Sequence, residues 1–246
     1  AYTGAVAQKF GLPMGIAWAG AGLMALAFAV LLGLALLRLR GHYFAIASLV
    51  VAEVLRELVN AATDLTGGGM GLNLPVPTMA SVDAQARFFF YAMFGLAALT
   101  FAATLVTTYS KLGFGLRCIR QNEAAADMLG VDTTFYKVSG FALSGVFVGM
   151  AGAVYASWVY YIEPPDVFDV LFSVKAIVMV LLGGAGSVFG PLIGAALFLG
   201  LEELVWRNYL EVHTGVLGLT IVVLVLFLPK GLLSLSQRFG QWRPLG

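Results

Sequence analysis

Long apolar runs alternate with short polar segments along this chain, and most of the runs are long enough to cross a bilayer as a helix. A helix rises about 1.5 Å per residue, so about 20 apolar residues cross the hydrocarbon core. A shorter run, residues 215–228, ends before Pro229. The runs that reach the full length cover residues 15–37, 42–60, 88–109 and 138–160.

One further run, residues 176–206, is too long for a single straight span and is interrupted by GGAGSVFGP at 183–191. We interpret it as two shorter helices around a glycine-rich break, which gives about six to seven spans, some of them broken or re-entrant. Broken helices often mark transport sites, so Gly183, Gly184 and Gly186 are candidate pathway residues. The predicted fold is an all-α, polytopic transmembrane bundle that occupies residues 1–246 as one domain.

Composition agrees with this prediction. Sixty per cent of the residues are hydrophobic, 11% are charged and the mean hydropathy is +0.92, which indicates an integral membrane protein. The net charge of +1, with no basic stripe, excludes a nucleic-acid partner. Cys118 is the one cysteine, so no internal disulfide forms. The chain opens AYTGAVAQKFGLP, without an initiator methionine or a basic leader, and we expect residues to be missing from its N-terminus.

The distribution of basic residues predicts the orientation, because lysine and arginine are retained on the cytoplasmic side. If residues 15–37 run from outside to inside, the outer segments hold only Lys9, Arg87 and Arg207. The outer loops are acidic instead. The polar segment 110–137 and the C-terminus are therefore expected in the cytoplasm. The basic residues of the inner segments are Arg38, Arg40, Lys111, Arg117, Arg120, Lys137, Lys230, Arg238 and Arg243.

The polar segment contains the signals of a short helix. Asn122 is a plausible N-cap, Glu123 lies in the first turn where the helix dipole favours an anion, and Gly130 is a C-terminal stop. The helix EAAADML has a smooth, alanine-rich surface that suits a cleft in another protein. The alternative is a plain helical connector between two spans.

Small residues recur in three further places. The loop LTGGGMGL, residues 65–72, is either a gate that lines a pathway or a flexible outer loop. Two other sets repeat at intervals of four, which places small side chains on one helical face and favours close helix packing. The loop glycines are Gly67, Gly68, Gly69 and Gly71, and the packing candidates are Gly145, Gly149, Ala153, Gly190 and Gly194.

Three ionisable residues, Glu53, Arg56 and Glu57, lie inside an apolar run. Such residues are costly in lipid and often mark a transport path, and their spacing places them on one helical face. The alternative is a structural ion pair near the outer interface.

Other chemistry is not indicated. His42 and His213 each stand alone without metal-ligand spacing, and no catalytic motif occurs. A G-x-x-x-x-G-K-[ST] motif is also absent, so the chain is not expected to be an enzyme, and ATP hydrolysis, if used, belongs to another chain.

The chain resembles the M-type permease subunit of the branched-chain amino acid ABC importers. The similarity extends through nearly all of the chain, and its most informative block is SKLGFGLRCIRQNEAAADMLGV at 110–131. The glycine loop departs from the family pattern, which often has serine and asparagine or aspartate there. The remaining blocks are RLRGHYFAIASLVVAEVLREL, LTGGGMGL, AGAVYA, VLLGGAGSVFGPLIGAAL and PKGLL.

The resemblance implies a type II-like importer permease of the bacterial inner membrane, whose EAA-containing coupling helix docks on the ATPase. It would pair with a second homologous permease, two cytoplasmic ATPase subunits that bind ATP and Mg, and an extracytoplasmic binding protein. Leucine, isoleucine and valine are the expected substrates, with urea or amides as alternatives. A rival hypothesis is an ion-coupled secondary transporter or channel that uses Glu53, Arg56 and Glu57. The expected coupling residues are Glu123, Ala124, Ala125, Asp127 and Gly130.

Overall fold

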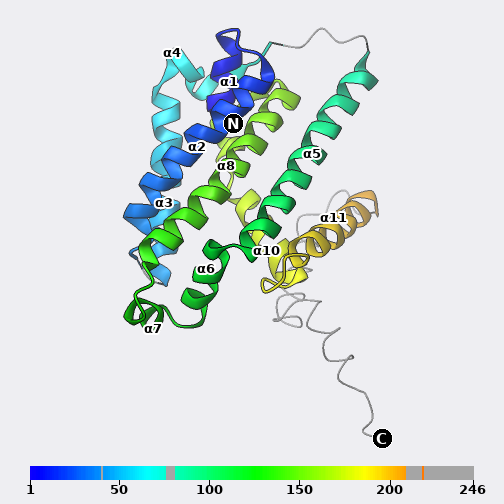
Figure 1. Cartoon of the computed structure of the whole chain (residues 1–246). Coiled ribbons are helices and arrows are strands. Elements are labelled where there is room, and N and C mark those ends of the chain that lie inside the picture. The colour runs from blue at the N-terminus through cyan, green and yellow to red at the C-terminus, as the bar shows by residue number, and fades with distance from the viewer. Residues whose placement is uncertain (40, 76–80, 209–217, 219–246) are drawn as a thin grey trace, which may run out of the picture. The chain divides into compact units, whose positions relative to one another are not determined.

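The computed structural model describes residues 1–39, 41–75, 81–208 and 218, and most of them are helical (Figure 1). The chain divides into two compact units, Ala1–Phe168 and Asp169–Gly246. The second unit contains α10 (Val170–Gly183) and α11 (Gly190–Asn208). The first contains α1 (Tyr2–Lys9), α2 (Met14–Leu36), α3 (His42–Ala61), α4 (Thr63–Thr66), the 3-10 helix η1 (Gly68–Met70), β1 (Leu72–Asn73), α5 (Val82–Tyr109), α6 (Lys111–Gln121), α7 (Glu123–Met128), α8 (Thr133–Val159), β2 (Tyr161–Ile162) and α9 (Pro164–Val167).

Three of the described helices, α2, α5 and α8, are long and apolar enough to cross a membrane. They coincide with predicted runs, and the all-α polytopic fold class is confirmed. Helices α5 and α8 begin five or six residues before their apolar runs because a polar residue caps each one. Ser81 Oγ accepts from the Ala84 N–H at 3.2 Å, and Asp132 Oδ1 accepts from the Phe135 N–H at 2.9 Å.

The other predicted runs have different outcomes. Helix α3 forms over 20 residues but contains Glu53, Arg56 and Glu57, so it does not reach the apolarity of the three spans. The run 176–206 is two helices, as predicted, because α10 ends at Gly183 and α11 begins at Gly190. The run 215–228 lies outside the described residues, apart from Gly218.

Small side chains fill the contact between α2 and α8, and large apolar side chains point away from it. A Cβ added at Gly145 would lie 2.8 Å from Ala29 Cβ, and one added at Gly149 would collide with Ala25. By contrast, Leu23 and Val148 are 66% and 71% exposed. This pattern is typical of helices in lipid, where close backbone packing replaces the hydrophobic effect as the source of association.

A buried polar cluster joins α1, α2 and α8 near the C-terminal end of α8. Gln8 Nε2 donates to Ser157 Oγ at 2.8 Å, Trp18 Nε1 donates to the same oxygen at 2.9 Å, and Ser157 Oγ donates to the Ala153 carbonyl at 2.8 Å. Gln8 and Ser157 are 3% and 0% exposed. The cluster therefore cross-links three helices at the end of the unit that also contains α4 (Figure 1).

A small cap that the sequence did not predict closes this end of the unit. Strand β1 pairs antiparallel with β2, with Leu72 opposite Ile162. The Tyr161 hydroxyl lies 2.6 Å from Glu163 Oε1 and 2.9 Å from the Met70 carbonyl, so its proton is shared between two acceptors. The hydrogen bond to Glu163 raises the pKa of the Tyr161 phenol, which keeps it protonated as a donor.

Candidate functional site

The polar segment folds as two short helices, α6 and α7, at the end of the first unit opposite α4 (Figure 1). Ser110 Oγ accepts from the Gly113 N–H at 3.4 Å at the start of α6. Asn122 Oδ1 accepts from the Ala125 N–H at 3.1 Å, so it caps α7 as expected. In the sequence the polar segment looks continuous, but the caps Ser110 and Asn122 divide it into two helices.

Helix α7 ends at a glycine with left-handed backbone. Gly130 has φ +81°, its N–H donates to the Asp127 carbonyl at 2.9 Å, and the Val131 N–H donates to the Ala126 carbonyl at 3.0 Å. This pair of bonds is a Schellman motif, in which a residue without Cβ is strongly favoured. Gly130 therefore fixes both the length of α7 and the direction in which the chain enters α8.

Helix α6 packs closely on α8 and supports α7. A Cβ at Gly115 would collide with the Tyr136 ring, and a Cβ at Gly140 would lie 3.2 Å from Leu116 Cδ1. The contact between α6 and α8 thus depends on small residues, like the contact between α2 and α8.

The Glu123 side chain turns back toward the helices of the unit. Its Oε1 lies 2.7 Å from Lys137 Nζ, and the Glu123 and Lys137 side chains are 35% and 24% exposed. Both border a small polar cavity of about 200 Å³ that Arg38, Thr134, Gly33 and Leu37 also line. Glu123 therefore connects α7 to α8 at a cavity that α2 also borders.

A different set of residues, on α7 and at its C-cap Leu129, faces outward. Ala124 and Asp127 are exposed, Ala125 is half-buried and Ala126 is buried. Met128 and Leu129 are 83% and 84% exposed, although both are apolar. Sequence reasoning missed Met128 and Leu129; the available signal was two large apolar residues at the end of an otherwise alanine-rich, polar-flanked helix.

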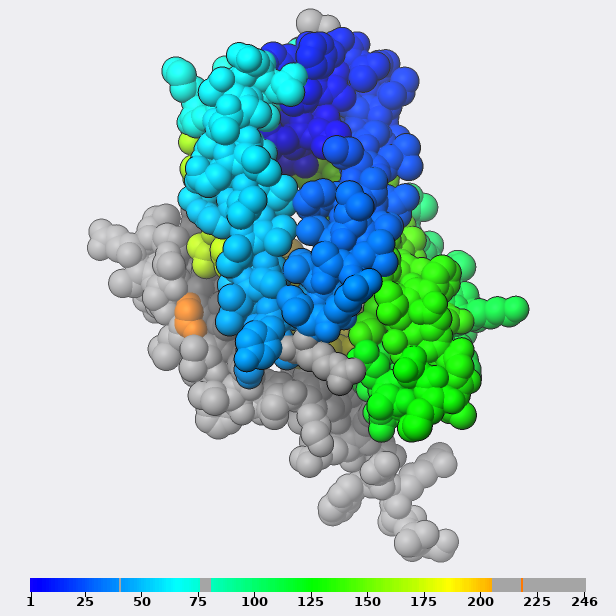
Figure 2. Space-filling view, turned by 90° about the vertical axis from the view of Figure 1, so that its left-hand side faces the viewer, coloured from blue at the N-terminus to red at the C-terminus, as the bar shows by residue number. Residues whose placement is uncertain are grey.

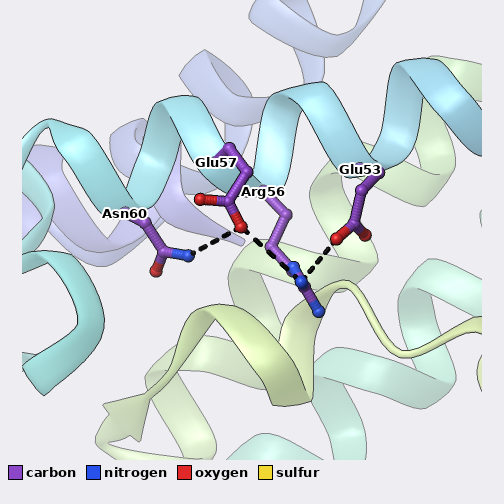
Figure 3. A network of polar contacts seen from close by, with 4 residues as sticks. All are labelled: Glu53, Arg56, Glu57 and Asn60. Carbon is purple, nitrogen blue, oxygen red and sulfur yellow. Dashed lines mark hydrogen bonds and ion pairs between the residues drawn. The ribbon is translucent and has the colours of Figure 1, made fainter.

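The ionisable residues of α3 form a connected group, which we call the α3 triad: Glu53, Arg56 and Glu57. Arg56 Nη2 pairs with Glu53 Oε1 and lies 3.6 Å from Glu57 Oε1, and Asn60 Nδ2 lies 3.5 Å from Glu57 Oε1. Figure 3 shows Arg56 projecting from α3 between the two carboxylates. The side chains of Glu53, Glu57 and Arg56 are 58%, 64% and 35% exposed, so the structure brings the triad together without burying it.

The glycine loop packs tightly instead of extending freely. Gly67, Gly68 and Gly71 all have positive φ, and a Cβ at Gly68 would lie 2.8 Å from the Asn60 carbonyl oxygen. Thr66 Oγ1 donates to the Val59 carbonyl at 2.7 Å and accepts from the Gly68 N–H at 3.2 Å. Gly69 is exposed with open space around it. The loop is thus anchored to the end of α3 at Val59 and Asn60, two and three residues beyond Glu57 of the triad.

In the second unit the glycines bring two helices into close contact. A Cβ at Gly183 would collide with the Gly190 carbonyl, and one at Gly194 would collide with the Met179 carbonyl. Gly184 is buried with φ +106°, whereas Gly186 lies exposed in the break.

One ion pair of this unit was not expected from the sequence. Lys175 Nζ lies 2.5 Å from Glu202 Oε1 and joins α10 to α11. The two residues are 27 positions apart, so no local spacing rule reveals the pair. Within the described part of the chain, no group of three or more metal-ligating side chains occurs.

Comparison with known proteins adds the family context. Residues 1–228 match the model of the family described as "Branched-chain amino acid transport system / permease component". The permease protein LivM of the high-affinity branched-chain amino acid transport system of Escherichia coli (strain K12) is 29% identical over 242 residues, which are 88% of this chain and 56% of LivM.

Two other relatives match shorter stretches. The permease protein LivH of the same E. coli system is 30% identical over 135 residues, 54% of this chain and 43% of LivH. The nucleoside ABC transporter permease protein NupC of Lactococcus lactis is 34% identical over 85 residues, 33% of this chain and 27% of NupC. The chain thus spans about half the length of LivM and LivH. No solved structure matches it.

Proposed function

We propose that this chain, which belongs to the branched-chain amino acid transport permease family, is a transmembrane subunit of an ATP-driven importer of the bacterial inner membrane. Members of this family are non-catalytic transport subunits that carry no cofactor. ATP and Mg therefore bind to separate ATPase subunits in this proposal.

The main support for the proposal is the geometry of α7, in a chain that matches the permease family over residues 1–228. The helix has a defined cap at each end, an outward surface of Ala124, Asp127, Met128 and Leu129, and an inward carboxylate, Glu123. We assign the outward surface to contact with an ATPase subunit, because large exposed apolar side chains such as Met128 and Leu129 favour a protein partner over water.

In this mechanism, ATP-driven movement of the ATPases displaces α7. The displacement passes through Glu123 and Lys137 to α8, and through α6, whose last residue adjoins the Asn122 cap. Because α8 packs on α2 by small residues, these two spans move together and alternate the access of the pathway.

The partners are a second homologous permease, two cytoplasmic ATPases and an extracytoplasmic binding protein that delivers substrate. Leucine, isoleucine and valine are the proposed substrates, since the systems named for LivM and LivH carry branched-chain amino acids. Urea and other amides are the alternative substrates. The α7 end and the C-terminus are assigned to the cytoplasm from the distribution of basic residues.

Reconstitution tests the proposal. The full-length permease, its partner permease, the ATPases and the binding protein are assembled in proteoliposomes, and leucine uptake is measured with ATP and with a non-hydrolysable analogue. We expect uptake that requires hydrolysis and is abolished by Ala125→Trp in α7, while the variant still inserts in the membrane. ATP-independent uptake by the permease alone would contradict the proposal.

A secondary carrier is the second candidate, because the α3 triad offers exposed ionisable groups inside an apolar helix. A carrier of this kind would transport without the ATPases and would respond to an imposed proton or sodium gradient. Uptake by the purified permease in ATP-free vesicles, with and without such gradients, separates the two functions.

A further inference from the structure

The α3 triad lies well inside the length of its helix. Glu53 is 11 residues and Glu57 is 15 residues beyond His42, the first residue of α3. At about 1.5 Å per residue these positions are roughly 16 and 22 Å along a helix of roughly 30 Å. The charges therefore lie past the middle of the helix, in the half nearer to Ala61, and not at either end.

The two carboxylates face away from the rest of their unit. Phe44, Val51 and Leu55 share one face of α3 and are half-buried. Ile46, Val50, Glu53 and Glu57 share the opposite face at spacings of four, three and four. These four residues are 60%, 56%, 58% and 64% exposed. Figure 2 shows α3 at the surface of the first unit, uncovered in this view by other described residues.

This face is poorly suited to lipid. Helix α3 is long enough to span a bilayer, and ionised carboxylates on a helix at that depth turn toward a water-filled path or a partner because lipid cannot solvate them. Arg56 is the one described cation within salt-bridge distance of either carboxylate, so the triad carries one negative charge in excess. A complementary ligand must therefore present a cationic group.

We propose that the α3 triad binds the head group of a zwitterionic aliphatic amino acid during its passage through the permease. The excess carboxylate charge holds the α-ammonium group, and Arg56 holds the α-carboxylate. Glu57 is the looser partner of Arg56, at 3.6 Å, and is the carboxylate that exchanges the guanidinium for the ammonium. Val50 and Val54, 56% and 53% exposed beside the triad, contact the branched side chain.

This assignment rests on the proposed function, and it goes further by giving the pathway a specific recognition chemistry. A neutral substrate such as urea has no charged group to pair with the carboxylates or with Arg56. An α-amino acid presents both an ammonium and a carboxylate within one head group. A basic side chain of the second permease is a different occupant of the same face, and the experiments below separate it from the substrate.

The first experiment measures leucine uptake and ATP hydrolysis together in proteoliposomes of the complete transporter with saturating binding protein. Glu53→Gln, Arg56→Gln, Glu57→Gln and the triple variant are compared with Asp64→Asn, an exposed carboxylate just beyond α3. We expect each triad variant to lower uptake by about tenfold, the effect of losing one charge-assisted hydrogen bond. ATP hydrolysis and co-purification of the partner permease should persist, and Asp64→Asn should match the wild type.

The outcomes are distinct. If the single variants fail but the neutral triple variant transports normally, the triad is a structural ion pair and the proposal is wrong. Loss of partner co-purification in step with uptake would assign the face to a basic residue of the second permease. If the wild-type transporter takes up no leucine, the proposed function fails before the triad is tested.

The second experiment reads the environment of the face without relying on transport rates. Single cysteines at Val50, on the same face as the carboxylates, and at Val51, on the half-buried face, are introduced in a Cys118→Ser background of the complete transporter. Both variants keep the three charges of the triad. A charged, membrane-impermeant thiol reagent should modify Val50→Cys, and leucine with the binding protein and ATP should slow the reaction several-fold. Val51→Cys should react slowly in both conditions. Modification of Val50→Cys only by a lipophilic reagent would place the face in lipid and overturn the proposal.

Discussion

Glu123 lies in the first turn of α7, a position where its charge also interacts favourably with the helix dipole. Its carboxylate contacts Lys137 of α8 and borders the polar cavity, so it is turned away from the outward surface of α7. The five coupling residues expected from the sequence thus divide into Glu123 and Ala125, which face the unit at least in part, and Ala124, Asp127 and Gly130, which are exposed. The contact with Lys137 assigns Glu123 to the connection between α7 and α8, and not to the outward surface.

Removing the Glu123–Lys137 pair should weaken coupling without weakening ATPase binding. Glu123→Gln and Lys137→Gln each remove a partly buried charge-assisted contact of about 1–2 kcal/mol. We expect uptake per ATP hydrolysed to fall several-fold in each variant, and the loss in the double variant to be smaller than the sum of the two, because the residues share this contact. Equal co-purification of the ATPases is the control, and additive losses would contradict a shared role.

Gly130 offers a test of backbone conformation alone. No atom lies within 4 Å of an added Cβ, and φ is +81°, so Gly130→Ala introduces strain of about 1 kcal/mol and no steric clash. We expect lower coupled uptake and faster proteolysis of the α7 segment. Gly130→Asn should be milder, because asparagine tolerates left-handed backbone. Identical behaviour of the alanine and asparagine variants would argue against the Schellman end of α7.

The contact between α2 and α8 can be tested with two glycines that differ only in their surroundings. An added Cβ collides with Ala25 at Gly149 and meets nothing within 4 Å at Gly95 of α5. Gly149→Val should therefore destabilise the complex by about 1–3 kcal/mol through overpacking, and Gly95→Val should have a much smaller effect. Thermal unfolding of the detergent-purified complex measures the difference, and similar melting temperatures would refute close packing at Gly149.

At the scale of elements, the residues at which α7 begins and ends determine which side chains it exposes. The Asn122 cap and the Gly130 stop limit the helix to Glu123–Met128, which leaves Met128 and Leu129 protruding where the chain reverses toward α8. A longer helix would rotate these side chains to other directions.

The outward surface of α7 predicts a specific loss of ATPase binding. Met128→Glu or Leu129→Glu should reduce co-purification of the ATPase subunits by about tenfold or more, because a charge replaces an apolar contact at a desolvated interface. Met70→Glu is the matched control, since Met70 is a similarly exposed methionine at 87% in the cap near α4. Retention of the ATPases by both α7 variants would exclude this surface as the docking site.

Local signals predicted the elements well and their contacts less well. Apolar runs of membrane length located α2, α5 and α8, and glycine and proline located the break between α10 and α11, because both signals depend on near neighbours in the chain. The pairs Lys175–Glu202 and Leu72–Ile162 depend on residues that only the folded chain brings together. For the same reason the sequence indicated that Glu123 matters without indicating that it faces Lys137.

At the scale of the whole molecule, the two ends of the first unit differ in chemistry. The α7 end carries Lys111, Arg117 and Arg120 on α6, and the opposite end carries Asp64, Glu163 and Asp166 around the cap. This asymmetry supports an orientation with α7 in the cytoplasm.

Thiol labelling in a Cys118→Ser background tests the orientation. Asp127→Cys on α7 and Met70→Cys in the cap are both exposed positions at opposite ends of the unit. An impermeant reagent should label Met70→Cys in spheroplasts, whose inner-membrane proteins are accessible from outside. It should label Asp127→Cys only in inverted vesicles, prepared from cells without the ATPase subunits that we assign to this surface. The reverse pattern would invert the assigned topology.

The polar cluster of Gln8, Trp18 and Ser157 has a mechanical consequence for the first unit. It fastens α1, α2 and α8 together at the end opposite α7, while the small residues between α2 and α8 join these two spans along their length. Helices that are packed along their length and cross-linked at one end are expected to move as one rigid body. A displacement of α7 would then move α2 and α8 together and would not separate them.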